Sequence, residues 1–243
     1  MTEHRNRLNQ PIGFPLPDWR GAPRPSRTPM QGRFCRLEPL DPARHADQLW
    51  DAIQLDRDGR NWTYLPVGPF DAAAAFRVWA ETASVGDDPV FFAIVDQATG
   101  RAVGYASFMR IDPKNGVIEV GHINFTPALQ KRPAATEAMF LMMRRVFDEL
   151  GYRRYEWKCD SCNAPSRAAA ARLGFAYEGL FRQAVVTKGR NRDTAWFSIL
   201  DREWPALKVA FERWLAPENF APDGSQRESL SALTKAALAP LRG

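Results

Sequence analysis

The chain has 243 residues and a formal net charge of +5 at pH 7, with 33 Lys and Arg against 28 Asp and Glu. Apolar residues make up 45% of the chain, which is enough for a core and excludes a wholly disordered protein. The basic excess favours an anionic ligand, but no basic stripe interleaved with aromatic residues occurs. We therefore expect no nucleic acid as the primary partner.

The chain contains no apolar run close to the ~20 residues of a membrane span, and its first residues are polar. We therefore expect a cytoplasmic protein without a membrane partner. The three cysteines, Cys35, Cys159 and Cys162, are too few for a disulfide framework. A zinc site needs four ligands, usually from a second cysteine or histidine pair, so we predict no metal.

The chain divides into three parts by composition. Residues 1–31 are proline-rich and predict an extended N-terminal segment that either wraps over the surface or stays disordered. Residues 32–218 alternate regular apolar patterns with turns and predict one domain. Residues 219–243 predict a polar tail that could hold a loosely packed helix.

The central part predicts an α+β fold, with a mixed, mostly antiparallel, twisted sheet of about seven strands flanked by helices. Asp41 and Asp71 are the expected N-caps of the first two helices. Strands are expected at 33–38, 90–96, 102–111, 117–125, 154–159, 175–187 and 194–201, and helices at 42–54, 71–84, 133–150, 164–173 and 203–215.

Four local sequences in this order resemble the GNAT superfamily of acetyl-CoA-dependent N-acetyltransferases, and within it the branch that acetylates the N-terminal amine of ribosomal proteins. The resemblance covers roughly residues 33–203. The four matching segments are Trp62-Thr63-Tyr64-Leu65-Pro66, Val103-Gly104-Tyr105-Ala106-Ser107, Ile118-Glu119-Val120-Gly121-His122 with the turn from Gln130 to Ala138, and Asn163-Ala164-Pro165-Ser166 with Arg172-Leu173-Gly174-Phe175.

The resemblance implies acetyl-CoA as co-substrate, with its pyrophosphate held by backbone N–H groups at the turn before the long helix. Pro133 stands where the family has a glycine, and proline has no N–H to donate. The resemblance also implies that one open strand edge and one helix cap contact the pantetheine arm. The implied acetyl-CoA contacts are Ile123, Asn124, Phe125, Gln130, Lys131, Arg132, Ala134, Ala135, Thr136 and Asn163.

The catalytic residues implied by the resemblance are a base for the attacking amine and an acid for the leaving thiolate. Glu119 is the favoured base and His122 the rival. Strict strand alternation would put them on opposite faces, with only one facing the acceptor, unless the bulge that the resemblance implies in this strand intervenes. Ser166 is the expected acid, because Ala170 occupies the position of the tyrosine used by many superfamily members. Plain helix capping by Asn163 and Ser166 and an acetylated Cys162 remain alternatives.

The acceptor is expected to lie against an apolar wall formed by Trp62, Tyr64 and Phe70. The sequence thus predicts an N-acetyltransferase that passes the acetyl group to a primary amine, on a protein N-terminus or a small molecule, by direct attack in a ternary complex. The alternative is a degenerate member that binds CoA or acts as a protein-interaction module. The sequence leaves open whether the protein forms a homodimer.

Overall fold

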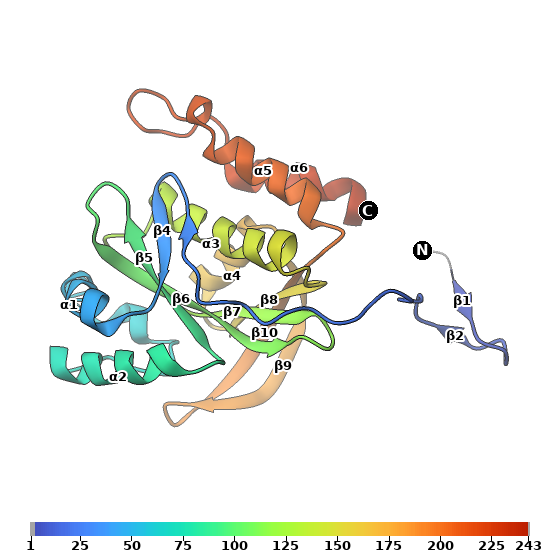
Figure 1. Ribbon diagram of the computed structural model, residues 1–243, viewed down its shortest axis with the longest axis horizontal. Coiled ribbons are helices and arrows are strands. Elements are labelled where there is room, and N and C mark those ends of the chain that lie inside the picture. Colours follow the sequence, from blue (N-terminus) through green and yellow to red (C-terminus); the bar gives the residue numbers. More distant parts are fainter. Residues whose placement is uncertain (1–2, 243) are drawn as a thin grey trace.

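The computed structural model describes residues 3–242 and has the predicted α+β fold (Figure 1). Eight strands form the main sheet in the order β3-β4-β5-β6-β7-β8-β10-β9, and every neighbouring pair is antiparallel except β7 and β8. The main-sheet strands are β3 (Met30–Gln31), β4 (Cys35–Pro39), β5 (Val90–Asp96), β6 (Ala102–Asp112), β7 (Val117–Phe125), β8 (Arg154–Asp160), β9 (Ala176–Thr187) and β10 (Arg190–Leu200).

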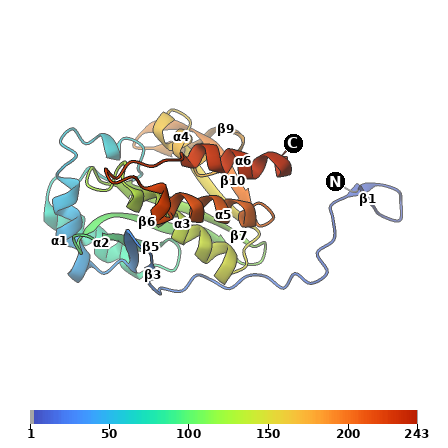
Figure 2. The ribbon, with the colours of Figure 1, turned by 90° about the horizontal axis from the view of Figure 1, so that it is seen from above.

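Six α-helices cover the two faces of this sheet, with α1 and α2 on one side and α3 and α5 on the other (Figures 1 and 2). The helices are α1 (Pro42–Ile53), α2 (Ala73–Val85), α3 (Pro133–Arg144), α4 (Ala164–Arg172), α5 (Trp204–Leu215) and α6 (Leu230–Arg242). Within residues 3–242, none of the helices combines the length and apolar character needed to cross a bilayer.

Local sequence explains where most helices begin. Asp41 accepts a hydrogen bond from the Ala43 N–H, and Pro42 occupies the first helical turn of α1, as predicted. The predicted cap of α2 is wrong, because that helix begins at Ala73 after Ala72, which makes no side-chain cap bond. Asp71 therefore lies one residue too early to cap it.

The sheet has one strand more than predicted, because the short strand β3 lies in the proline-rich segment. That segment also contains a two-stranded hairpin, β1 (His4–Arg5) with β2 (Pro11–Ile12), which projects away from the sheet (Figures 1 and 2). Two-residue strands carry no detectable periodicity, so only tertiary contacts reveal them.

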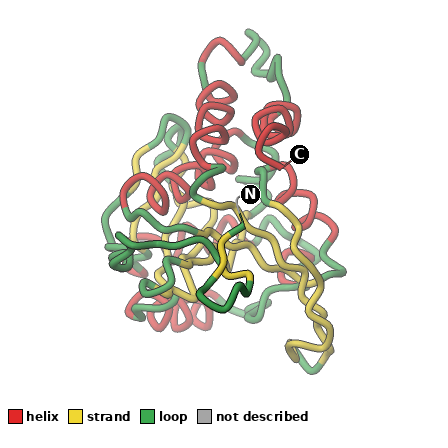
Figure 3. The backbone as a smooth tube through the Cα atoms, turned by 90° about the vertical axis from the view of Figure 1, so that its right-hand side faces the viewer, coloured by secondary structure: helices red, strands yellow, loops and turns green. Residues whose placement is uncertain are grey.

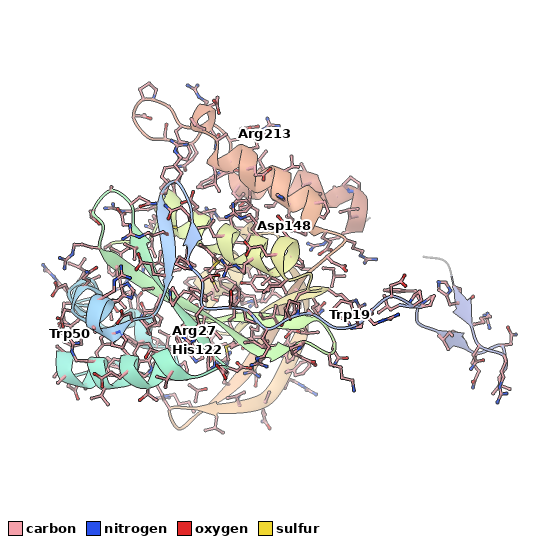
Figure 4. All side chains as sticks on the ribbon, viewed as in Figure 1. Trp19, Arg27, Trp50, His122, Asp148 and Arg213 are labelled. Carbon is pink, nitrogen blue, oxygen red and sulfur yellow. The ribbon has the colours of Figure 1, made fainter. Side chains whose placement is uncertain are left out.

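The rest of the N-terminal segment is tied to the domain by specific contacts. Trp19 donates its indole N–H to the Lys114 carbonyl, where the segment leaves the sheet for the hairpin (Figure 4). Arg145, which is 5% exposed, donates to the carbonyls of Thr28 and Pro29. These contacts hold residues 19–29 along the edge of the domain.

Two apolar clusters fill the two sides of the sheet. The larger cluster joins α3, α5 and α6 to inward-facing residues such as Phe108 and Ile118. The smaller cluster joins α1 and α2 to Phe91 and Tyr105. The two faces alternate along each strand, as strand geometry requires. The side with the smaller cluster is called the α1/α2 face below.

A buried carboxylate joins α3 to the start of β4. Glu137, 4% exposed, accepts backbone N–H bonds from Arg33, Phe34 and Cys35 at 2.8, 2.6 and 2.8 Å. Three donors on one carboxylate satisfy backbone groups that the protein interior would otherwise leave unpaired. This contact sets the position of α3, whose first turn lies beside the site described next.

Glu137→Ala should therefore lower the free energy of unfolding by about 3 kcal/mol or more, because each buried donor left unpaired costs about 1–3 kcal/mol. Urea unfolding measures the change. Glu81→Ala, on the exposed side of α2, is the control and should cost less than about 0.5 kcal/mol. Similar small losses for both variants would show that the carboxylate does not anchor α3.

Candidate active site

The parallel strands β7 and β8 separate in the middle of the sheet. They pair from Val117 with Arg154 to Val120 with Trp157, and beyond these residues the two strands no longer pair with each other. The backbone of residues 121–125 is therefore open on the side of β8, while its other side stays paired with β6. An open strand edge is where an extended ligand can add backbone hydrogen bonds.

A β-bulge interrupts β7 where this opening begins. Ser107 pairs with Gly121 and Tyr105 with Asn124, so two steps on β6 match three on β7. His122 adopts the left-handed conformation, with φ of +48°. A bulge changes which side of the sheet a side chain faces and increases the local twist.

The bulge brings Glu119 and His122 to the same face of the sheet. Glu119 lies between Ile118 and Val120, which both belong to the larger cluster, so strand alternation turns its side chain to the α1/α2 face. The His122 ring lies 5.1 Å from the Phe91 ring, which belongs to the apolar cluster of that face (Figure 4). Only one of the two candidate bases was expected to face the acceptor unless a bulge intervened, and the bulge at His122 is that exception, so both lie on the α1/α2 face.

Glu119 lies in a buried network of charges. Its carboxylate is 2.9 Å from Lys158 Nζ and 3.1 Å from Arg110 Nε, and Lys158 Nζ is also 2.6 Å from Glu156. The side chains of Glu119 and Lys158 are only 4% and 6% exposed. Burial raises the pKa of Glu119, while the cations of Lys158 and Arg110 oppose that rise.

His122 is partly exposed, and it forms no ion pair with any of residues 3–242. Burial lowers its pKa below the ordinary 6.5, Arg110 lowers it further, and Asp88 opposes both effects. The imidazole is therefore mainly neutral near pH 7. A neutral imidazole can accept a proton, which an imidazolium cannot.

The turn before α3 has the features of an anion site. Pro133 occupies the first helical turn, and Arg132 precedes it without capping the helix through its side chain. Within the described chain, the backbone N–H groups of Lys131 and Ala134 have no hydrogen-bond acceptor. The side chains of Lys131 and Arg132 are exposed. Open amides, a helix N-terminus and two cations fit a pyrophosphate, even without an amide at Pro133.

Other residues predicted to contact acetyl-CoA are already engaged by the protein. Gln130 Nε2 donates to the Phe125 carbonyl at 2.8 Å and to Asn61 Oδ1 at 3.0 Å. Thr136 is 3% exposed and accepts a bond from Arg172, so its side chain points into the protein. Asn124 is 2% exposed, which leaves its backbone for a ligand rather than its side chain. Ala135 and Ile123 pack partly against the larger cluster.

Ser166 lies beside Trp157, the last residue of β8 that pairs with β7. Its hydroxyl oxygen accepts the indole N–H of Trp157 at 3.0 Å, and the hydroxyl also interacts with the thiol of Cys159, whose pKa it helps to lower against the effect of burial. Asn163 caps α4 by accepting the Ser166 N–H at 3.1 Å. The cap fixes the first turn of α4 next to the opening between β7 and β8.

The predicted acceptor wall is only partly exposed. Trp62 is 3% exposed and packs edge-on against Phe70, so its ring belongs to the smaller apolar cluster. Tyr64 donates its hydroxyl to the Cys162 carbonyl at 3.1 Å, and Lys188 donates to the Trp62 carbonyl at 2.7 Å. These hydrogen bonds connect the loop with the start of α4 and with the tip of the β9–β10 hairpin. The hairpin is the pair of yellow strands that extends to the lower right in Figure 3.

The sequence and structure were compared with known proteins. A model of the family described as "Acetyltransferase (GNAT) domain" matches residues 35–176. The chain belongs to the GNAT acetyltransferase family. A GCN5-related N-acetyltransferase from Brucella melitensis, known from a crystal structure, is 52% identical with a TM-score of 0.89, and the match covers 90% of this chain and 100% of that one.

Curated relatives of the GNAT domain are more distant. The uncharacterized N-acetyltransferase p20 of Bacillus licheniformis is 33% identical over 113 residues, which are 46% of this chain and 63% of the relative. The putative ribosomal N-acetyltransferase YdaF of Bacillus subtilis (strain 168) is 28% identical over 109 residues, 45% and 59% of the two chains. Each of these matches spans less than two thirds of the relative's own length.

The resemblance inferred from the sequence is confirmed, and so is acetyl-CoA as the acetyl donor of the GNAT family. The residues that would hold it are the open edge at 121–125 and the basic turn before α3. Sequence reasoning did not find Lys158, Arg110 and Ser107, which contact the two candidate bases. The alternation of charged and apolar residues along 154–159 was the one available signal for Lys158.

Replacing both Lys131 and Arg132 with alanine should weaken acetyl-CoA binding about tenfold at low ionic strength, because two charge-assisted contacts to phosphate are lost. The difference should shrink at high salt, which screens exposed charges. Isothermal titration calorimetry at two salt concentrations measures both effects.

The control removes the same charge at the opposite end of β7, through Lys114→Ala with Arg202→Ala, and should leave the affinity unchanged. Equal affinity for the wild type and the Lys131/Arg132 variant would mean that this basic pair does not contact the ligand.

His122 should make the fold more stable above pH 6.5 than below it. Its pKa is lower in the folded protein than the ordinary 6.5, so below 6.5 the unfolded chain binds more protons. The free energy of unfolding should therefore decrease as the pH falls from 6.5 toward the folded-state pKa. His45, whose pKa burial also lowers, adds to the same trend.

Urea unfolding at several pH values between about pH 7.5 and about pH 5.5 measures this dependence, because that range brackets the ordinary histidine pKa. His122→Gln should reduce the slope and leave the part due to His45. A slope that His122→Gln does not alter would show that His122 titrates normally in the folded protein.

Proposed function

We propose that this protein transfers the acetyl group of acetyl-CoA to a primary amine that approaches from the α1/α2 face. The observation that carries the proposal is the placement of Glu119 and His122 together on that face, where β7 and β8 separate. Family membership supports the acetyl donor. The acceptor and the route of the proton are inferred from the residues around the opening.

The chemistry needs a neutral amine, because an ammonium has no lone pair for attack. Glu119 and His122 are the two groups able to take the proton. Ser166 would donate its hydroxyl hydrogen toward the sulfur that leaves, and the open backbone at 121–125 would hold the arm of the donor. Acetyl-CoA and the acceptor amine would reach the same opening in the sheet from its two sides, and this proximity favours direct attack.

The acceptor side is bordered by the loop that carries Tyr64, which hydrogen bonds connect to Cys162 before α4 and to Lys188 of the β9–β10 hairpin. A peptide N-terminus or a small primary amine would lie against this loop. The name of the relative YdaF, a putative ribosomal N-acetyltransferase, supports a protein N-terminus as one candidate.

Incubating the protein with acetyl-CoA and a panel of amines should release free thiol only when a suitable primary amine is present. The panel should contain short peptides with free N-termini, the same peptides blocked at the N-terminus, and small polyamines. Mass spectrometry of the product locates the acetyl group. Stabilisation by acetyl-CoA in a thermal-shift assay without thiol release for any amine would favour the alternative of a non-catalytic CoA-binding module.

Glu119→Gln should lower kcat by about tenfold or more while acetyl-CoA binding is retained, since general-base and electrostatic groups contribute about 10²–10⁴-fold. Part of the loss reflects Lys158, which would then keep only Glu156 as a partner. Steady-state kinetics measure kcat, and isothermal titration calorimetry measures the binding of acetyl-CoA. An unchanged kcat would remove Glu119 from the proposed mechanism.

A further inference from the structure

A serine on β6 contacts His122 and the backbone next to it. Ser107 is completely buried, with an exposed fraction of 0%. Its hydroxyl oxygen lies 3.1 Å from His122 Nδ1 and 3.1 Å from the Gly121 carbonyl oxygen. Neither the family match nor the resemblance in sequence gives this serine a role.

The two contacts determine which ring nitrogen carries the hydrogen. A carbonyl oxygen only accepts, so the Gly121 contact requires the single hydroxyl hydrogen of Ser107. The contact with Nδ1 is then a hydrogen bond only if Nδ1–H donates to the hydroxyl oxygen. In a neutral imidazole one nitrogen carries the hydrogen and the other a lone pair. The lone pair is therefore on Nε2.

We infer that Ser107 is a positioning residue that holds His122 in the tautomer with its lone pair on Nε2, which makes His122 the proton acceptor for the incoming amine. The inference rests on the proposed function and goes beyond it by assigning one base and the residue that orients it. A buried group that fixes a tautomer is a known way to prepare a histidine for proton transfer.

The surroundings of His122 agree with this assignment. The ring packs on Phe91 of β5, which itself lies 5.6 Å from Trp79 of α2, so the imidazole lies against the apolar cluster of the α1/α2 face. The charged groups that act on it are Arg110 from β6 and Asp88 before β5, and burial with Arg110 keeps the ring mainly neutral near pH 7. The left-handed φ of +48° is strained for histidine and persists because the bulge requires it.

Glu119 is less suited to the same task. Its side chain is 4% exposed, and its carboxylate is held by Lys158 and Arg110 at 2.9 and 3.1 Å. An amine would have to displace one of these cations or work through a water molecule. The carboxylate more readily serves as a fixed negative charge that attracts the incoming ammonium to the α1/α2 face.

The step balances with groups already named. His122 Nε2 takes one proton from the ammonium and becomes an imidazolium that later releases this proton to solvent. The amine nitrogen forms a bond to the acetyl carbonyl carbon, and the bond between that carbon and sulfur breaks with its electron pair on sulfur. The nitrogen loses a second proton, which ends on the sulfur and completes the thiol. Until that proton arrives, Ser166 stabilises the thiolate by donating its hydroxyl hydrogen in a hydrogen bond to the sulfur.

The decisive measurement is the ¹⁵N NMR spectrum of the imidazole nitrogens in the wild-type protein at neutral pH, without acetyl-CoA or acceptor. The chain has three histidines, so comparison with His122→Gln assigns the signals of His122. We expect Nδ1 to be protonated and Nε2 unprotonated. The opposite pattern in the wild type would overturn the inference and would leave the proposed acetyl transfer unaffected.

Variants connect the tautomer to turnover. Ser107→Ala should shift His122 toward a mixture of tautomers and lower kcat by about tenfold, a part of the ~10²–10⁴-fold that a general base contributes. The KM for acetyl-CoA should stay unchanged. The matched control is Ser198→Ala, another buried strand serine, whose hydroxyl donates to Glu178 instead of contacting a histidine. It should leave both spectrum and kcat unchanged.

The results separate the two levels of the proposal. A wild-type spectrum as expected together with an unchanged kcat in Ser107→Ala would show that the serine does not position a base. If no amine is acetylated by the wild type, the proposed function fails, whereas the NMR result still decides the tautomer.

Discussion

The site depends on one constraint, which is that the parallel strands β7 and β8 stay paired over only four residue pairs. Beyond Val120 and Trp157 the two strands diverge, and the backbone of β7 keeps hydrogen bonds on one side only. The bulge at His122 lies at this point, where it bends the strand and adds twist. A fully paired sheet would leave neither an open backbone edge nor space for a ligand between the strands.

The separation also explains why charged side chains can lie within the sheet. Glu119 and Glu156 are balanced by the cations of Lys158 and Arg110, of which Lys158 is buried with the two carboxylates and Arg110 lies at the surface. Buried charges are tolerated when they are paired in this way. Because this network occupies the carboxylate, the imidazole of His122, whose pKa burial lowers, is left on this face as the neutral group that can accept a proton.

Much of the fold could be predicted, because long elements carry their own periodicity. The helix around Met139 and the strand at 117–125 have clear patterns, and the cap at Asp41 is a local signal. The misplaced cap at Asp71 and the missed strand β3 show the limit, since short elements depend on contacts with distant segments. Trp62 was expected at a surface because a loop position does not reveal that Phe70 covers its ring.

The sequence by itself determined the order of the elements, the family and the basic turn at residues 130–136, because these features are local. Only the tertiary structure decided that Lys158 reaches Glu119 and that Ser107 reaches His122. Both contacts depend on the register between neighbouring strands of the sheet, and register is set by the packing of whole faces. The bulge then reversed the alternation that the sequence alone implies, and so placed both candidate bases on one face.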